Sequence, residues 1–255
     1  MLQLTPELTP YQFASNTPIE AVDLDGLEAM FVHGTFSNRS TWDKGFVKNI
    51  TKATHWDEVQ KSVYYWNWLG ANNSDDRVKA GTKIYDWFIS ENNPHRDLKH
   101  ATLIGHSHGG NVNKIAKNLL EKDGWRVDII NIETPQRIDF QSDNSGTGIY
   151  MNFYSSSDLI QWFGTLPFNI SDNGRLDQKA YLNFQLIESN TPFSFLGNLK
   201  TWFSVAGGHS LHNNPFAQQQ VIEKTKIFFR KEESNSNNQN IQKRTVNVGG
   251  KIYKE

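Results

Sequence analysis

The sequence contains no cysteine among its 255 residues. This absence excludes disulfide bonds, thiolate nucleophiles, cysteine-ligated zinc and iron–sulfur clusters. It leaves the cellular compartment open, because a chain without thiols folds equally well in reducing and oxidising surroundings. Any catalytic chemistry must therefore come from other side chains.

An excess of charge of either sign is also missing, because 26 Lys and Arg face 27 Asp and Glu and leave a net charge of −1. Proteins that bind nucleic acid usually present a strongly basic face, so this balance argues against a nucleic-acid partner. No apolar run approaches the roughly 18–20 residues that a membrane span needs. The first residues lack the basic and apolar regions of a signal peptide, so we expect neither a signal peptide nor a transmembrane segment in this chain.

The sequence that is present divides into three zones of different composition. Residues 1–27 are rich in Pro, Thr and Asn and predict an irregular arm. Residues 28–231 alternate short β-like runs with helical patterns, as one α/β domain does. Residues 232–255 begin with a Glu-, Ser- and Asn-rich tract that buries too little apolar surface to order itself, so we predict a polar, flexible tail.

Short strands and helices follow one another through the middle zone. Strand-like runs occupy residues 29–33, 62–68, 101–105, 127–133 and 150–155, with a later one near 201–205. Apolar residues recur at helical spacing from Val112 to Leu120, and Asn214-Pro215 marks the start of a further helix through Phe229. The strands are nearly continuous in apolar character, which is typical of burial on both faces. We predict an α/β fold with a mostly parallel central sheet flanked by helices.

The sharpest motif, GHSHGG, runs from Gly105 to Gly110 between a predicted strand and a predicted helix. A sharp turn at this place lifts the hydroxyl of Ser107 above the sheet edge, and glycines two residues before and after it permit the close packing that the turn requires. The N–H groups at the start of the helix then face a developing negative charge. The motif predicts that Ser107 is a catalytic nucleophile rather than an idle serine in a tight turn.

A second motif lies upstream, where the first predicted strand ends in His33-Gly34-Thr35. A loop after an early strand supplies the other half of an oxyanion hole in sheets of this kind. We expect the N–H of Thr35, or that of Phe36, to act together with the N–H of His108. Alone, the motif would indicate a loop glycine beside a buried histidine, but its combination with the GHSHGG motif favours the catalytic interpretation.

An activated serine needs a histidine base and a carboxylate that orients it, in the chain order Ser, acid, His. Asp158 follows the strand 150–155 and is the first choice of acid. Glu133, at the end of the preceding strand, is its rival, and Asp172 and Asp177 remain open.

Only His209 and His212 follow Asp158 in the chain. His209 lies in a Gly-Gly loop just before the last helix, where a catalytic base is expected, and His212 lies three residues further on as the alternative. The predicted triad is therefore Ser107, Asp158 and His209. His106 is expected to pack beneath the serine.

Aromatic residues, 13% of the chain, gather on both sides of the proposed site. Residues 159–200, between the acid and the base, hold many of them and predict a lid over the pocket, which favours an acyl-chain substrate. Asp/Asn/Gly turns at 143–146 and 172–174 offer oxygen ligands for calcium, but such turns without metal are far commoner. We expect neither a metal nor a cofactor.

The GHSHGG motif around Ser107 and the strand that ends in His33-Gly34-Thr35 together resemble the α/β-hydrolase superfamily, specifically its lipase-like serine esterases. The resemblance covers about residues 29–231. It implies an α/β-hydrolase fold and the cleavage of carboxylic esters of lipids by the triad named above.

The N-terminal arm resembles the end of an Rhs repeat-associated core domain, which precedes variable toxin domains in bacterial polymorphic toxins. The boundary motif of that family is Pro, four residues, Asp-Pro, one residue, Gly-Leu. Pro18, Asp23, Gly26 and Leu27 match it, and Leu24 stands where the family has proline. In the family, cleavage after that leucine would free a toxin that begins at Glu28.

The two resemblances together imply an antibacterial lipase or phospholipase that a specialised secretion system delivers into a rival cell. They imply three partners: a lipid or phospholipid substrate, the Rhs shell with its secretion machinery, and a cognate immunity protein. Peripheral contact with a membrane fits a lipid substrate. Two other interpretations stay open, namely the same triad acting on a small ester or an amide, and a non-catalytic delivery or binding module.

Overall fold

The computed structural model describes most of the middle zone and part of the C-terminal zone. The described residues are 28–35, 37–38, 40, 42–54, 63–66, 68, 73–137, 139–143, 146–155, 176–177, 179–180, 182–186, 214–243, 245–248 and 251–254. The arm 1–27, Asp158, His209, His212 and the strand expected near 201–205 lie outside them.

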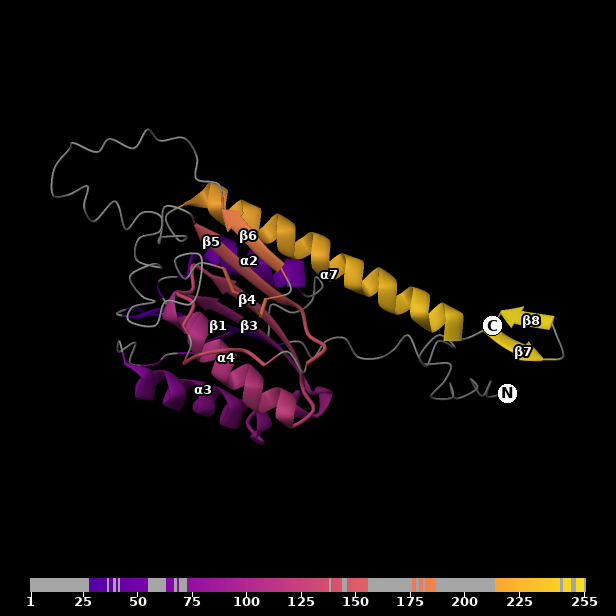
Figure 1. Cartoon of the computed structure of the whole chain (residues 1–255), viewed down its shortest axis with the longest axis horizontal. Helices are drawn as coiled ribbons and strands as arrows, with labels where there is room; N and C mark the ends of the chain where they lie inside the picture. The colour runs from indigo at the N-terminus through magenta and orange to yellow at the C-terminus, as the bar shows by residue number, and fades with distance from the viewer. Residues whose placement is uncertain are drawn as a thin grey trace, which may run out of the picture.

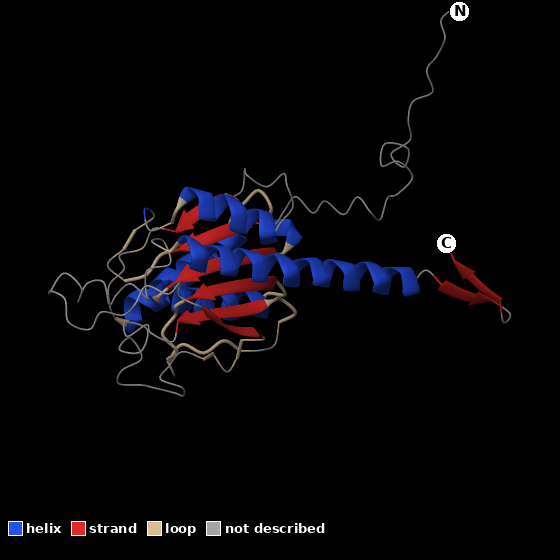
Figure 2. Ribbon diagram, turned by 90° about the horizontal axis from the view of Figure 1, so that it is seen from above, coloured by secondary structure: helices blue, strands red, loops and turns tan. Residues whose placement is uncertain are grey.

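Six parallel strands form the central sheet (Figures 1 and 2). They are β1 (Glu28–Val32), β2 (Val63–Trp66), β3 (His100–His106), β4 (Arg126–Ile132), β5 (Tyr150–Ser155) and β6 (Leu182–Leu186). Their order across the sheet is β2-β1-β3-β4-β5-β6. From β1, next to one edge, the chain therefore steps outward to β2, crosses back over β1 to β3, and then proceeds strand by strand to the other edge.

Helices cover both faces of this sheet, as Figure 1 shows. They are α2 (Lys44–Thr54), α3 (Ser74–Ile89), α4 (His108–Lys122) and α7 (Pro215–Lys243), with a single 3-10 turn at Arg96–Leu98. The helices α3 and α4 pack together on one face, and α2 and α7 on the other. The predicted α/β fold with a parallel central sheet is confirmed.

Alternating side chains of β1 show how one strand serves two cores. Ala29 and Phe31 belong to the apolar cluster under α2 and α7, whereas Met30 and Val32 belong to the cluster under α3 and α4. This alternation follows from the two-residue period of a strand. All four side chains are buried, which is why the strand is a continuous apolar run instead of a polar/apolar alternation.

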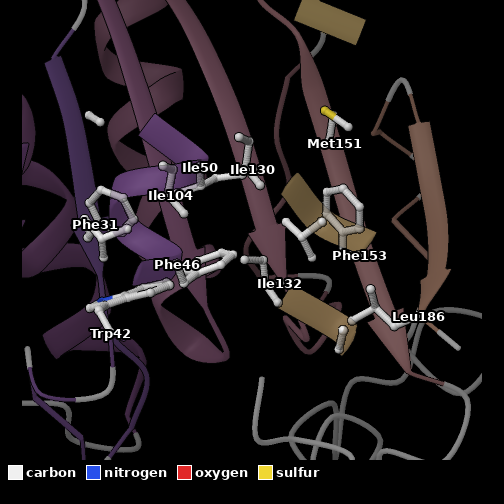
Figure 3. Packing of buried hydrophobic residues seen from close by; sticks show 14 of the residues in the cluster. Phe31, Trp42, Phe46, Ile50, Ile104, Ile130, Ile132, Met151, Phe153 and Leu186 are labelled. Carbon is white, nitrogen blue, oxygen red and sulfur yellow. The ribbon is translucent and has the colours of Figure 1, made fainter. Parts of the chain in front are cut away.

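The core under α2 reaches the edge of the sheet where the strands end. Trp42 contacts Phe31 edge to face at 5.1 Å between ring centroids and stacks on Phe46 at 6.2 Å. Figure 3 shows this group together with isoleucines of β3 and β4. Aromatic pairs of this kind contribute about 0.5–1.5 kcal/mol beyond the energy of area burial, so they stabilise the core at the end of β1.

The structure changes the prediction for the insert 159–200. Residues 182–186 form β6, which pairs with β5 and closes one edge of the sheet, so this part of the insert is not a lid. Its burial alternates between half-buried and exposed positions up to a buried Leu186, as expected of an edge strand with one covered face. Apart from 176–177 and 179–180, the rest of the insert lies outside the described residues.

The last helix is longer than the sequence pattern indicates. The prediction ends it at Phe229, but α7 continues to Lys243 and is followed by an antiparallel hairpin of β7 (Thr245–Val248) and β8 (Lys251–Lys254). Figures 1 and 2 show α7 beginning at the carboxyl edge of the sheet and extending past the opposite edge. Among the helices that the structure describes, none has the length and apolar character needed to cross a membrane.

Candidate active site

Ser107 lies in the tight turn between β3 and α4, at the carboxyl edge of the sheet. Its backbone has φ 54° and ψ −134°, a conformation that side-chain-bearing residues rarely adopt. Such strained turns persist where the surrounding structure enforces them. The Ser107 side chain makes no hydrogen bond that caps the N-terminus of α4, although serine is a preferred N-cap residue.

Three glycines of the GHSHGG motif explain how the turn closes. A Cβ atom on Gly105 would lie 2.7 Å from the Cα of Gly110, and one on Gly110 would lie 2.0 Å from Oγ1 of Thr134, so neither position has room for a side chain. A Cβ on Gly109 would lie 2.3 Å from the carbonyl oxygen of Val32, at the end of β1. The glycines therefore let α4 start directly against the neighbouring strand end, as a nucleophile elbow requires.

The second sequence motif meets the first in this structure. A Cβ on Gly34 would lie 2.6 Å from the Cβ of Ser107 and 3.1 Å from its Oγ, so the backbone of the His33-Gly34-Thr35 loop touches the serine. Thr35 is the next residue, and His108 is the first residue of α4, where the helix dipole is positive. The structure thus places Gly34 against Ser107, with Thr35 and His108 as the next residues of the two segments.

Trp68 holds the loop that carries Gly34. Its Nε1–H donates a hydrogen bond to the carbonyl oxygen of His33 at 2.8 Å, and its ring stacks on the His33 imidazole with centroids 6.0 Å apart. The Nδ1–H of His33 in turn donates to the carbonyl of Gly34 at 2.9 Å. The loop is therefore fixed by a side chain from the segment after β2, which the sequence motifs do not reveal.

His106 and Glu133 form a buried pair directly below the elbow. The Nε2 of His106 lies 3.0 Å from Oε2 of Glu133, with side chains 8% and 3% exposed. Because a carboxylate oxygen only accepts, the imidazole N–H is the donor. The ring of His106 also meets Trp42 edge to face. His106, the residue before the serine, is therefore buried against Trp42 and against Glu133, the rival acid.

Asp177, another alternative acid, lies in a buried network under α4 rather than at the open strand ends. Its Oδ2 lies 2.7 Å from Nζ of Lys114, both side chains being at most 1% exposed, and it accepts from the Tyr150 hydroxyl. Burial alone would raise the pKa of Asp177, but the Lys114 ammonium and the Tyr150 hydroxyl hold it below its usual value. Asp177 is thus engaged in joining α4 to β5 and to the segment before β6.

The two remaining members of the predicted triad, Asp158 and His209, lie outside the described residues. The nearest described positions are Ser155, the last residue of β5, and Asn214, whose Oδ1 accepts from the N–H of Ala217 and caps α7. Within the part of the chain that the structure describes, no cluster of three His, Asp or Glu side chains offers a metal site.

The strand order and the elbow together define the fold. A parallel sheet in which the central strand β3 leads through a strained Ser turn into α4, with a glycine loop after the neighbouring β1 against the serine, is the α/β-hydrolase arrangement. Carboxyl esterase 2 from the mycorrhizal fungus Tuber melanosporum is similar in structure, with a TM-score of 0.49, 11% identity, and coverage of 82% of this chain and 79% of that one. In sequence, neither a protein-family model nor a curated protein matches.

Proposed function

We propose that the protein is a serine hydrolase that cleaves carboxylic esters of lipids, with Ser107, Asp158 and His209 as its triad. The observation that carries the proposal is the contact between Gly34 and Ser107. It places the glycine loop after β1 beside a serine in a strained turn, which is where an oxyanion-hole loop lies relative to a catalytic serine. The two residues belong to independent sequence motifs and are 73 positions apart in the chain, yet they are in contact in the structure.

In this mechanism the Ser107 oxygen attacks the ester carbonyl while His209 removes its proton. The carbonyl oxygen becomes an oxyanion, which the N–H groups of Thr35 and His108 stabilise. His209 then gives the proton to the departing alcohol and leaves an acyl-Ser107 intermediate. A water molecule, deprotonated by His209, releases the fatty acid and restores Ser107, while Asp158 keeps the imidazole oriented.

Chain connectivity supports the choice of Asp158 and His209. Asp158 follows the end of β5 by three residues, and a three-residue segment reaches at most about 10 Å. His209 precedes Asn214 by five residues, a reach of at most about 17 Å, and α7 begins at the same carboxyl edge of the sheet (Figures 1 and 2). The length of chain therefore allows both residues to reach the edge where Ser107 lies.

The lipid substrate and the antibacterial role are the finer parts of the proposal. Aromatic residues of the insert 159–200 supply apolar surface for an acyl chain. The Rhs-like arm supports delivery as a toxin into a rival cell through an Rhs shell, with an immunity protein that protects the producing cell. The same triad on a small ester or an amide remains the second candidate, favoured if the pocket proves narrow and polar.

Fatty-acid release from vesicles tests the proposal. The full chain is incubated with vesicles of phosphatidylethanolamine and phosphatidylglycerol, beside Ser107→Ala and the control Ser90→Ala. Ser90 bonds to the carbonyl of Trp87 at the far end of α3, so its loss should leave activity intact. Release that only Ser107→Ala abolishes supports the proposal. Intact vesicles with cleavage of p-nitrophenyl butyrate would select the small-ester alternative, and no reaction of Ser107 with a fluorophosphonate would indicate a non-catalytic module.

A further inference from the structure

Two strained backbone positions lie side by side at the carboxyl edge. Among the described residues only Lys99, Ser107 and Glu133 combine a side chain with a positive φ. Ser107 follows β3 and Glu133 follows β4, and these strands are neighbours with His106 opposite Ile132. The strain of Ser107 belongs to the elbow, but Glu133 has no such explanation from the motif.

The side chain of Glu133 is bonded to the neighbouring strand. Beside its positive φ, its carboxylate accepts a hydrogen bond from His106 of β3 at 3.0 Å. A buried carboxylate without such a donor is strongly unfavourable, and this one is only 3% exposed. The pair therefore links the residue immediately before the nucleophile to the end of the next strand.

Backbone hydrogen bonds continue this link in both directions. The N–H of Ser107 donates to the carbonyl of Ile132 at 2.9 Å, and the N–H of Glu133 donates to that of Phe153 at 2.7 Å. The turn at Ser107 is thus hydrogen-bonded to the end of β4 twice, once through the Ser107 amide and once through the side chain of His106. The end of β4 is in turn hydrogen-bonded to β5, the strand that precedes Asp158.

We propose that Glu133 is a positioning residue that acts through His106: it holds the peptide leading into Ser107 so that the hydroxyl keeps its attack geometry. The inference rests on the proposed serine-hydrolase function and deepens it. It gives Glu133 a role other than that of the triad acid, which bonds the catalytic base.

Substitution of Glu133 by glutamine distinguishes a positioning residue from a triad acid. Glu133→Gln keeps an acceptor oxygen for the His106 N–H but removes the charge, so a positioning residue should retain kcat within about tenfold. Glu133→Leu leaves the imidazole donor buried and unpaired, so kcat should fall about 10²-fold through misplacement of Ser107, with KM little changed. A triad acid behaves differently, because its amide variant loses about 10⁴-fold in kcat.

A second variant tests whether the effect passes through His106. His106→Phe fills similar space without a hydrogen bond, so in that background Glu133→Leu should cause little additional loss. Interaction through contact makes the two effects strongly non-additive, whereas separate roles would make them add. The double variant also removes both buried polar partners, which is less destabilising than removing one, so it remains measurable if a single variant folds poorly.

The opposite end of the same strand provides a matched control. His100 begins β3, and its Nε2 lies 2.7 Å from Oδ2 of Asp128 on β4, so this pair has the same chemistry at the amino edge. Asp128→Leu should lower Tm at least as much as Glu133→Leu but leave kcat within about threefold. Comparison of Asp128→Leu with Glu133→Leu therefore separates an effect on positioning from an effect on stability alone.

The experiment measures kcat and KM with p-nitrophenyl butyrate and the rate of fluorophosphonate labelling of Ser107, with Tm alongside. We expect Glu133→Gln to have a kcat within about tenfold of wild type and Glu133→Leu to have a kcat lowered about 10²-fold. Adding His106→Phe to Glu133→Leu should lower kcat no further. A loss in Glu133→Gln of about 10³-fold or more, or additive losses in the double variant, would overturn the inference. An inactive, unlabelled wild type would instead overturn the proposed function.

Discussion

Adding one methyl group at Gly34 is the sharpest perturbation of the proposed site. The Cβ of Gly34→Ala would lie 2.6 Å from the Cβ of Ser107, 3.1 Å from its Oγ and 3.2 Å from the carbonyl of His106. Carbon atoms in contact normally lie about 3.5–4.0 Å apart, so the loop and the serine must separate by about 1 Å. Gly34 does not have a positive φ, so alanine adds bulk without straining its own backbone.

The magnitude follows from that displacement. Misplacing a reacting group by about 1 Å can cost about 10²-fold in rate, which corresponds to about 2.7 kcal/mol of transition-state stabilisation. Overpacking costs about 1–3 kcal/mol of folding stability, or about 2–4 °C of Tm for each kcal/mol in a domain of this size. Gly34→Ala should therefore lose about 10²-fold in kcat/KM for p-nitrophenyl butyrate while it remains folded.

Gly81→Ala is the matched control, because its added Cβ would lie 2.6 Å from the Cβ of Ile115, in the contact between α3 and α4. The overlap is equal, but it is remote from the elbow, so Tm should fall and kcat/KM should stay within about threefold. If Gly34→Ala kept wild-type activity and Tm, or if Gly81→Ala lost as much activity, the reasoning that Gly34 fits against the catalytic serine would be refuted.

Three further predictions concern the supports of the site. Trp68→Phe keeps a ring on His33 but removes the bond to its carbonyl, so kcat/KM should fall about fivefold, since a hydrogen bond is worth about 1 kcal/mol; an unchanged value would contradict the role of Trp68. Lys114→Met leaves Asp177 buried without its cation, and chemical denaturation should show a loss of about 3–5 kcal/mol. The pKa of Asp177 is lowered in the folded state, so its stabilisation is complete above the unfolded value near pH 4 and lost as the pH falls through the folded pKa. Asp177→Asn should therefore flatten the acid limb of a Tm–pH profile, and an unchanged limb would count against the ion pair.

The central strands and the elbow could be predicted because their signals are local. Residues 101–106 of β3 are all buried, and none of them is Asp, Glu, Lys or Arg. The glycines around Ser107 are required by contacts within a few residues and with the end of β1. Gly34 could be assigned for a similar reason, since its loop directly follows a strand of the same kind.

The features that were missed depend on tertiary contacts. β6 has an alternating, half-exposed pattern and lies inside a segment whose aromatic residues suggested a lid. Lys114 belongs to the polar side of the predicted helix pattern, yet α4 is buried on this side as well, by Gln136 and Asp177 from distant segments. The pair of His106 and Glu133 spans two strands, so it follows from the register of β3 and β4 and from no sequence motif.

Covalent labelling of the wild-type chain tests the central claim most directly. The folded protein is treated with a fluorophosphonate, digested, and analysed by mass spectrometry for the peptide that carries the adduct. The account predicts a single phosphonylated residue, Ser107, because only a serine activated by a base and an oxyanion hole reacts at an appreciable rate. An unlabelled Ser107 in folded protein, or labelling of another serine that Ser107→Ala does not affect, would contradict it.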